Sequence, residues 1–263
     1  MNKVTSKDGT TIAYEKTGNG PAVILVDGAL CYRSFGPMAE LAKLLSPHFT
    51  VFTYDRRGRG ESSNGKPFTI EREVEDIEAL IDEAGGSAFV FGTSSGACLA
   101  MQAAAKLDKR IRKLALYEAP YNSDAATRQE WKDYRKQLAQ ALAANRRGDA
   151  VALFMKFVGT PAEQIEGMRK SPAWSMFEAV APTLEYDAAE IGDDRSVPLK
   201  QAARVTSPTL VMNGTAIPFM CDTAAALAKA IPHAQHHTLE GQRHDVDLKV
   251  LAPELVEFFS KKK

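Results

Sequence analysis

The chain has 263 residues, and its 33 lysines and arginines balance its 33 aspartates and glutamates. This length predicts one large domain, or one domain with an insertion, and the zero formal charge argues against a protein that binds nucleic acid or is drawn to an anionic membrane. The three scattered cysteines predict a cytoplasmic protein with neither a disulfide framework nor a zinc site. The N-terminus lacks the apolar stretch of a signal peptide, and apolar runs of about five residues are too short to span a membrane.

Short β-branched or aromatic runs alternate with helix patterns in the first half of the chain. The run at 22–26 is apolar throughout, as expected for a strand that helices cover on both faces. Apolar residues recur at helix spacing over 70–84, and an alanine-rich helix is expected over 97–106. This alternation predicts parallel strands joined by right-handed crossovers. The expected strands are 11–15, 22–26, 49–54, 88–91 and 114–117.

The middle of the chain has a different character, because no strand-like run occurs from about residue 122 to residue 203. Apolar side chains at helix spacing and four punctuating prolines predict a helical lid inserted there. Strand and helix patterns then return at 208–213, 222–230, a strand ending at Leu239, and 250–259, and the three final lysines are expected to fray. We therefore expect a core built from residues 1–121 and 204–263, interrupted by a lid at 122–203.

A G-x-S-x-G motif is centred on Ser94, after an expected strand and before an expected helix. A serine on such a sharp turn must adopt a strained backbone, and Gly92 and Gly96 avoid clashes on either side. Its hydroxyl then lies at a helix N-terminus, where backbone N–H groups favour an oxyanion. The motif therefore predicts a nucleophilic serine, although a serine- and glycine-rich turn without chemistry is the alternative.

Three further segments accompany this motif. Residues 26–30 read VDGAL, residues 54–62 read YDRRGRGES, and residues 241–245 read GQRHD. In this order they resemble the oxyanion loop, the D-x-R-G-x-G-x-S loop and the G-x-x-H segment of the α/β-hydrolase superfamily. The resemblance covers nearly the whole chain and implies the α/β-hydrolase fold, a mostly parallel central sheet flanked by helices with a helical lid insertion.

The resemblance also implies an oxyanion hole made of two backbone N–H groups, those of Ala29 and Ser95. Asp27 departs from the family pattern, because many members have histidine at that place. Backbone donors tolerate this substitution. The arginines of the 54–62 loop, which could suggest phosphate binding, are expected to brace the fold.

A serine hydroxyl needs a base to take its proton. Among five histidines, His244 lies in a polar turn after the last expected strand, where the superfamily keeps its base. His236 and His237 are neighbours in that strand, so they cannot both face one site. The sequence and the resemblance together therefore favour His244.

The acid of the triad is not at its usual place, because Ile217 stands three residues after Gly214, the glycine that follows the expected strand at 208–213. Glu118 directly follows the expected strand at 114–117, at the same sheet edge as Ser94. Zearalenone-lactonase-like hydrolases and haloalkane dehalogenases place the acid there, and triad geometry can be reached from different chain positions. Glu118 is therefore the expected acid, with a plain helix-dipole role as the alternative. Asp222 is the reserve, and Asp245 is expected to point away.

Trp174, Met176 and Phe177 in the expected lid are candidates for an apolar substrate pocket, although packing between helices explains them equally well. No cofactor or metal motif is present, so neither is expected, and the oligomeric state stays open. The resulting hypothesis is a serine hydrolase for a small, mainly apolar carboxylic ester or lactone. The alternatives are carbon–carbon bond cleavage, lyase or perhydrolase chemistry at the same site, or a ligand receptor with slow turnover, which the isoleucine at the usual acid position motivates.

Overall fold

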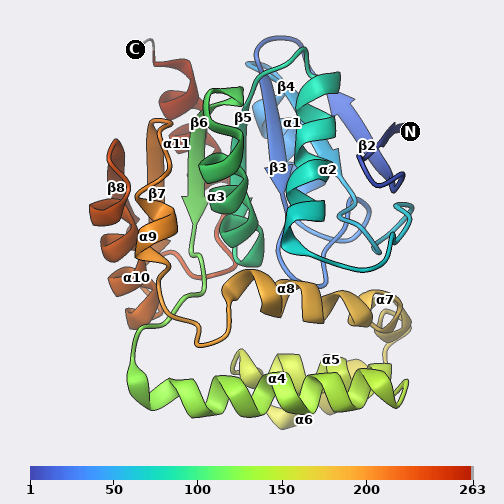
Figure 1. Ribbon diagram of the computed structural model, residues 1–263. Coiled ribbons are helices and arrows are strands. Elements are labelled where there is room, and N and C mark those ends of the chain that lie inside the picture. Colours follow the sequence, from blue (N-terminus) through green and yellow to red (C-terminus); the bar gives the residue numbers. More distant parts are fainter. Residues whose placement is uncertain (262–263) are drawn as a thin grey trace.

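A computed structural model describes residues 1–261, and its centre is an eight-stranded sheet (Figure 1). The strands lie in the order β1-β2-β4-β3-β5-β6-β7-β8. From β4 through β8 neighbouring strands are parallel, whereas β1 with β2 and β2 with β4 are antiparallel. The strands are β1 Asn2–Thr5, β2 Thr11–Thr17, β3 Ala22–Val26, β4 Thr50–Tyr54, β5 Ala88–Thr93, β6 Ile111–Tyr117, β7 Thr209–Gly214 and β8 Ala234–Leu239.

Eleven α-helices accompany the sheet within residues 1–261. None of these helices is long and apolar enough to cross a membrane. They are α1 Met38–Leu45, α2 Ile70–Glu83, α3 Ser95–Leu107, α4 Arg128–Ala143, α5 Arg147–Phe157, α6 Ala162–Arg169, α7 Trp174–Val180, α8 Leu184–Ile191, α9 Leu199–Ala202, α10 Pro218–Ala230 and α11 Leu248–Ser260.

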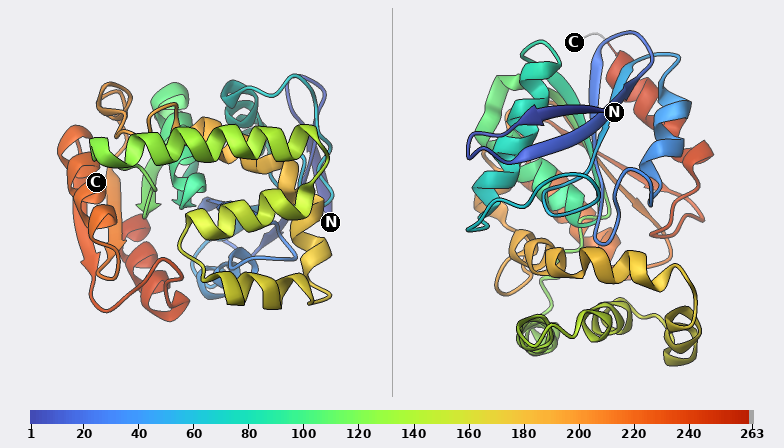
Figure 2. Two further views of the ribbon diagram at one scale, coloured as in Figure 1. Left: turned by 90° about the horizontal axis from the view of Figure 1, so that it is seen from below. Right: turned by 90° about the vertical axis from the view of Figure 1, so that its right-hand side faces the viewer.

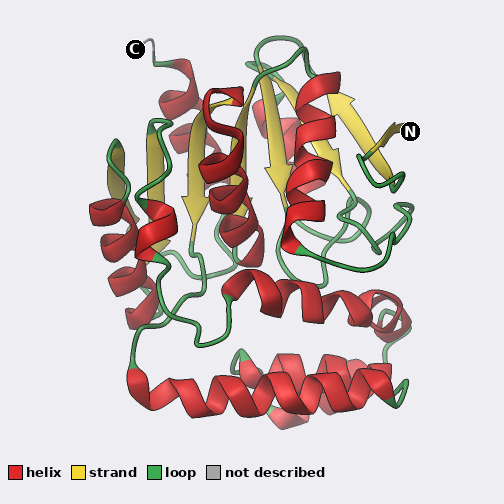
Figure 3. Cartoon of the chain, viewed as in Figure 1, coloured by secondary structure: helices red, strands yellow, loops and turns green. Residues whose placement is uncertain are grey.

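Helices cover both faces of the sheet (Figure 3). In β3, Ile24 and Val26 belong to the hydrophobic cluster that contains residues of α2, α3 and α10, whereas Val23 and Leu25 belong to the cluster with residues of α1 and α11. Successive side chains of a strand point to opposite faces, so a strand buried on both sides must be apolar throughout. The expected mostly parallel sheet flanked by helices is confirmed.

The segment between β6 and β7 is helical in the described structure. Helices α4 to α8, here called the helical layer, lie across the edge of the sheet at which the parallel strands end (Figures 1 and 2). Their own apolar side chains form a third hydrophobic cluster, which also includes Leu30 from the loop after β3. The limits of the expected lid, residues 122 and 203, remain a prediction.

Two elements were not predicted. β1 is a four-residue edge strand whose side chains are mostly exposed, and α1 is a helix of eight residues. A short exposed strand has no apolar pattern to reveal it. Of the three terminal lysines expected to fray, Lys262 and Lys263 lie outside the described residues, and Lys261 follows α11 directly.

Candidate active site

Ser94 lies on a strained turn between β5 and α3. Its φ of 55° and ψ of −131° are rarely adopted by a residue with a side chain. Both glycines of the motif are required because the backbone passes too close to them to leave room for a side chain. A Cβ on Gly92 would lie 2.4 Å from the Gly96 carbonyl oxygen, and a Cβ on Gly96 would lie 2.4 Å from the Val26 carbonyl oxygen. The glycines therefore allow the turn that leaves the Ser94 side chain half-buried rather than enclosed.

The loop after β3 passes directly beside Ser94. A Cβ added to Gly28 would lie 3.0 Å from Ser94 Cβ and 3.6 Å from its Oγ. Ala29 follows in the chain, and Ser95 is the first residue of α3, whose opening N–H groups have no partner within the helix. The two expected oxyanion donors thus come from segments that flank the Ser94 hydroxyl, and their role remains a prediction.

Glu118 and His244 are in direct contact. Glu118 Oε2 lies 2.7 Å from His244 Nδ1, and Glu118 Oε1 accepts a hydrogen bond of 2.9 Å from the Gly214 N–H. The Glu118 side chain is fully buried, whereas that of His244 is 40% exposed. An ionised carboxylate only accepts hydrogen bonds, so it fixes the proton on Nδ1 and leaves Nε2 able to take another.

Backbone contacts bring the three segments together although they are distant in sequence. The Ser94 N–H donates to the carbonyl of Tyr117, the residue before Glu118, over 3.0 Å. The Tyr117 hydroxyl donates to the carbonyl of Arg243, the residue before His244, over 2.5 Å. Within residues 1–261 no hydrogen bond joins Ser94 Oγ to His244. Such catalytic hydrogen bonds commonly shorten only when substrate binds.

The usual acid position of the family and the two other candidate acids lie elsewhere. Ile217 precedes α10, Asp222 is exposed on that helix, and Asp245 is exposed and lies 3.5 Å from Arg243. Glu118 is thus the carboxylate that contacts the histidine of the G-x-x-H segment.

Two other histidines have separate partners. His236 Nε2 lies 2.7 Å from Asn213 Oδ1, and His237 Nδ1 lies 2.7 Å from Glu254 Oε2. The two neighbours therefore face different groups, as the strand geometry requires.

The three pocket candidates have different surroundings. Trp174 is buried in the hydrophobic cluster of the helical layer, where its indole N–H donates to Glu178 over 3.1 Å. Phe177 packs edge-on against Phe35, with ring centroids 4.9 Å apart. Met176 is half-buried and does not belong to that cluster. Trp174 is therefore a packing residue of the helical layer, and Phe177 is the one that reaches the loop after β3.

A surface recess elsewhere on the sheet does not coincide with these residues. It has a volume of about 910 Å³ and is lined by residues such as Pro21, Phe49, Ile111 and Pro208, which precede or begin strands. It therefore opens at the opposite edge of the sheet from Ser94. Within residues 1–261 no three His, Cys, Asp or Glu side chains are grouped to hold a metal ion.

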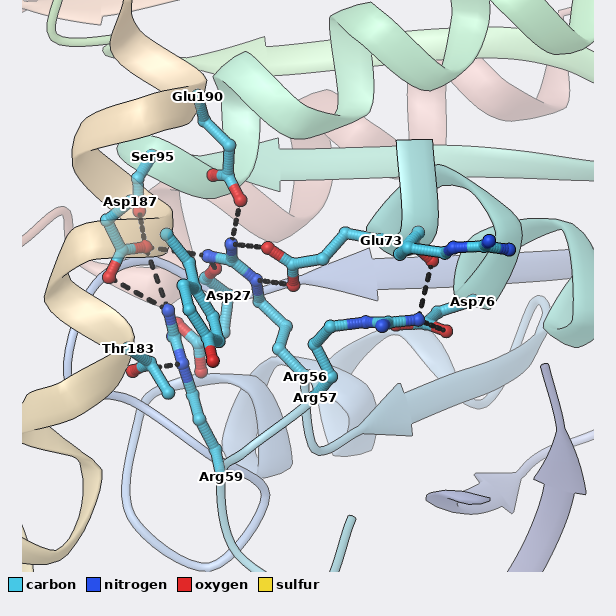
Figure 4. Close-up of polar contacts among 12 residues, drawn as sticks. Asp27, Arg56, Arg57, Arg59, Glu73, Asp76, Ser95, Thr183, Asp187 and Glu190 are labelled. Carbon is cyan, nitrogen blue, oxygen red and sulfur yellow. Dashed lines mark hydrogen bonds and ion pairs between the residues drawn. The ribbon is translucent and has the colours of Figure 1, made fainter. Parts of the chain in front are cut away.

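One contact to the site, made from the helical layer, was not predicted from the sequence. Asp187 on α8 accepts a hydrogen bond from Ser95 Oγ over 2.7 Å and ion-pairs with Arg56 and Arg59 (Figure 4). The bracing role expected for the arginine loop accordingly includes contacts to this helix. The local sequence does not single out Asp187, because α8 reads LEYDAAEI with acids at 185, 187 and 190, of which the structure buries Asp187 and Glu190.

Asp27, the departure from the family pattern, is buried beside the site. Burial raises its pKa from 3.8 to about 7, against the opposing effects of the Gly28 N–H and the nearby arginines. Its Oδ1 accepts from the Gly28 N–H over 2.8 Å, whereas Oδ2 is buried without a hydrogen-bond partner. The fold therefore favours the protonated form of this carboxyl.

The raised pKa of Asp27 predicts a pH-dependent effect of Asp27→Asn on stability. Above pH 4 the unfolded chain releases the proton that the folded chain keeps, so Asp27 costs the wild type on the order of 1 kcal/mol per pH unit up to about pH 7. Asparagine does not titrate, so the free energy of unfolding of the variant, relative to wild type, should rise from pH 4 to pH 7 and then level off. Urea denaturation at several pH values measures this. A difference between the two proteins that is constant over this range contradicts the prediction.

Comparisons with known proteins identify the family of the fold. A family model described as alpha/beta hydrolase fold matches residues 21–246. A zearalenone hydrolase from Cladophialophora bantiana is 24% identical over 231 residues, which are 75% of this chain and 86% of that protein. A crystal structure of an alpha/beta hydrolase from Sphaerobacter thermophilus is 47% identical, with a TM-score of 0.88 over 98% of this chain and 100% of that one. An enol-lactonase from Burkholderia xenovorans is 22% identical, with a TM-score of 0.65 over 99% and 100% of the two chains, and so shares the fold.

Proposed function

The chain belongs to the alpha/beta hydrolase fold family, and we propose that it is a serine hydrolase that cleaves a small, mainly apolar carboxylic ester or lactone. The observation that carries this proposal is the 2.7 Å contact between Glu118 and His244, in loops tied by hydrogen bonds to the strained turn of Ser94. A carboxylate, an imidazole and a serine hydroxyl in this order are the elements of a catalytic triad.

The proposed reaction begins when His244 Nε2 takes the proton of the Ser94 hydroxyl as Oγ attacks the substrate carbonyl. Glu118 holds the imidazole in the required tautomer and stabilises its charged form. The N–H groups of Ala29 and Ser95 receive the oxyanion, each contributing roughly 3–4 kcal/mol in the transition state. His244 then protonates the leaving oxygen, and it later activates water to release the acyl group from Ser94.

The substrate class rests on the apolar surroundings of the site and on the relatives. Tyr32 and Phe35 lie on the loop after β3, and Phe177 of α7 packs against Phe35. Relatives named as a zearalenone hydrolase and an enol-lactonase support ester or lactone cleavage. We also propose a cytoplasmic location, which the three free thiols support.

A fluorophosphonate probe tests the proposal, because it reacts only with an activated serine. We expect rapid labelling of Ser94 in the wild type and none in His244→Ala. The labelled protein should also hydrolyse members of a panel of p-nitrophenyl esters and lactones of graded chain length. Protein that is not labelled yet binds apolar ligands would overturn the proposal in favour of a receptor. Labelled protein that cleaves no ester or lactone would redirect the search to carbon–carbon, lyase or perhydrolase substrates.

A further inference from the structure

We propose that Asp187, on helix α8 of the helical layer, is a positioning residue that fixes both donors of the oxyanion hole. The inference rests on the proposed function, because the two N–H groups matter only if Ser94 forms a tetrahedral intermediate. It adds a residue from outside the core of the sheet to the machinery of the site. The contacts on both sides of Ser94 lead to it.

The first donor is held through its own side chain. Asp187 is 3% exposed, and its Oδ1 accepts a hydrogen bond from Ser95 Oγ over 2.7 Å. Figure 4 shows the Asp187 carboxylate between Ser95 on one side and the arginines on the other. Because the N–H of Ser95 is the proposed donor, anchoring its hydroxyl limits the movement of the donor itself.

The second donor is held through Arg59. Arg59 Nη2 donates to both oxygens of Asp187, at 2.8 and 2.9 Å. Its Nη1 donates to the carbonyl oxygens of Gly28 at 2.6 Å and Cys31 at 3.2 Å. These carbonyls lie on either side of Ala29, so the Asp187–Arg59 pair fixes the loop segment that presents the Ala29 N–H.

Arg56 joins the same group of residues from the other side. Its Nη1 donates to Asp187 Oδ1 over 2.8 Å and to the Asp27 carbonyl over 3.3 Å. It also ion-pairs with Glu73 and Glu190. Burial acts to raise the pKa of Glu73, but the charge of Arg56 outweighs it and lowers this pKa to about 2. Burial raises the pKa of Glu190 well above its usual value. Arg56 therefore has an ionised partner besides Asp187.

Arg59 depends on Asp187 for its ion pair more strongly than Arg56 does. Within the described residues, the Asp187 carboxylate is the one acid within ion-pair distance of Arg59. Thr183, the residue directly before α8, accepts from Arg59 Nε over 3.1 Å. Asp187 and Thr183 thus hold Arg59 by a charge and by a hydroxyl, and Arg59 in turn holds the loop beside Ser94. Charge-assisted hydrogen bonds between an arginine and a carboxylate are short and geometrically specific, which suits a positioning role.

The test compares Asp187→Asn with Glu185→Gln, an exposed carboxylate on the same helix. Donors of the oxyanion act in the transition state, so their displacement lowers kcat and leaves KM nearly unchanged. We expect kcat per titrated active site to fall about tenfold to a hundredfold in Asp187→Asn, less than the ~10²–10³ of losing a donor outright. Glu185→Gln should match the wild type. Normalising to titrated sites removes any contribution from unfolded protein.

Ser95→Ala provides a milder variant that leaves every charge in place. It keeps the Ser95 backbone N–H and removes only the hydroxyl contact to Asp187. We expect a smaller loss of kcat, and a parallel loss of affinity for a boronic acid that forms a tetrahedral adduct on Ser94. In the double variant with Asp187→Asn, the losses of kcat should not add. The positioning role is overturned if Asp187→Asn melts at lower temperature but keeps its kcat per active site, or if KM alone changes. Wild-type protein that a fluorophosphonate does not label would instead refute the proposed function itself.

Discussion

Ser94→Ala is expected to lower turnover on the order of 10⁶-fold while substrate binding is largely kept. The proposed reaction has no other nucleophile, and the residual rate comes from the oxyanion donors and from binding. Alanine keeps a Cβ at the same strained φ of 55°, so the turn and its strain are unchanged. Steady-state kinetics on the best p-nitrophenyl ester of the panel, with ligand binding measured separately, checks both halves of the expectation.

Ser260→Ala is the matched control for Ser94→Ala. Ser260 is an exposed serine at the end of α11, on the recess at the opposite edge of the sheet. Its replacement should leave kcat and KM unaltered. If Ser94→Ala keeps more than about a hundredth of the wild-type turnover, a nucleophilic role for Ser94 is wrong.

Glu118→Gln is expected to lower kcat by about 10⁴ with little change in KM. The glutamine amide is nearly the same shape, and its oxygen can still accept from the Gly214 N–H, so the loops should remain in place. An amide N–H facing Nδ1 forces the imidazole proton onto Nε2, and that tautomer cannot take the proton of Ser94. Kinetics and fluorophosphonate labelling should fall together.

Glu254→Gln tests the same substitution at a second histidine of the chain. Glu254 Oε2 lies 2.7 Å from His237 Nδ1, the same distance as in the Glu118–His244 pair, but on the outer strand and last helix. We expect no effect on kcat. A Glu118→Gln variant within tenfold of the wild type would mean that Glu118 is not the acid, and Asp222→Asn would then be the next variant to measure.

Local patterns predicted the elements of the sheet well. The run at 22–26 is β3 with the predicted bounds, and the helix expected at 70–84 is α2 at Ile70–Glu83. The inner apolar residues of both patterns are buried, whereas Ala22 and Ile70 at their ends are half-buried, so the sequence period and the environment agree over most of each element. The contact between Glu118 and His244 could be anticipated for a similar reason, since residues that follow parallel strands lie at one edge of the sheet, whereas the role of Glu118 as the acid stays a prediction.

The contacts of Asp187 could not be predicted in this way. Arg56 and Asp187 are 131 residues apart, and neither belongs to a motif that names the other. A buried carboxylate on a helix and a buried arginine on a loop become partners only through the packing of the helical layer on the strand ends. The charge composition does not reveal these contacts either, because a pair of opposite buried charges leaves the net charge of the chain unchanged.

The chain order of the three proposed triad residues bears on how the protein is made. Ser94 and Glu118 emerge from the ribosome early, whereas His244 follows β8, an edge strand of the sheet and the last strand along the chain. Chains begin to fold from the N-terminal side during synthesis. If the proposed triad is correct, a growing polypeptide contains the hydroxyl and the carboxylate before the histidine that takes the proton, and we expect it to be inactive towards esters until its last strand has docked.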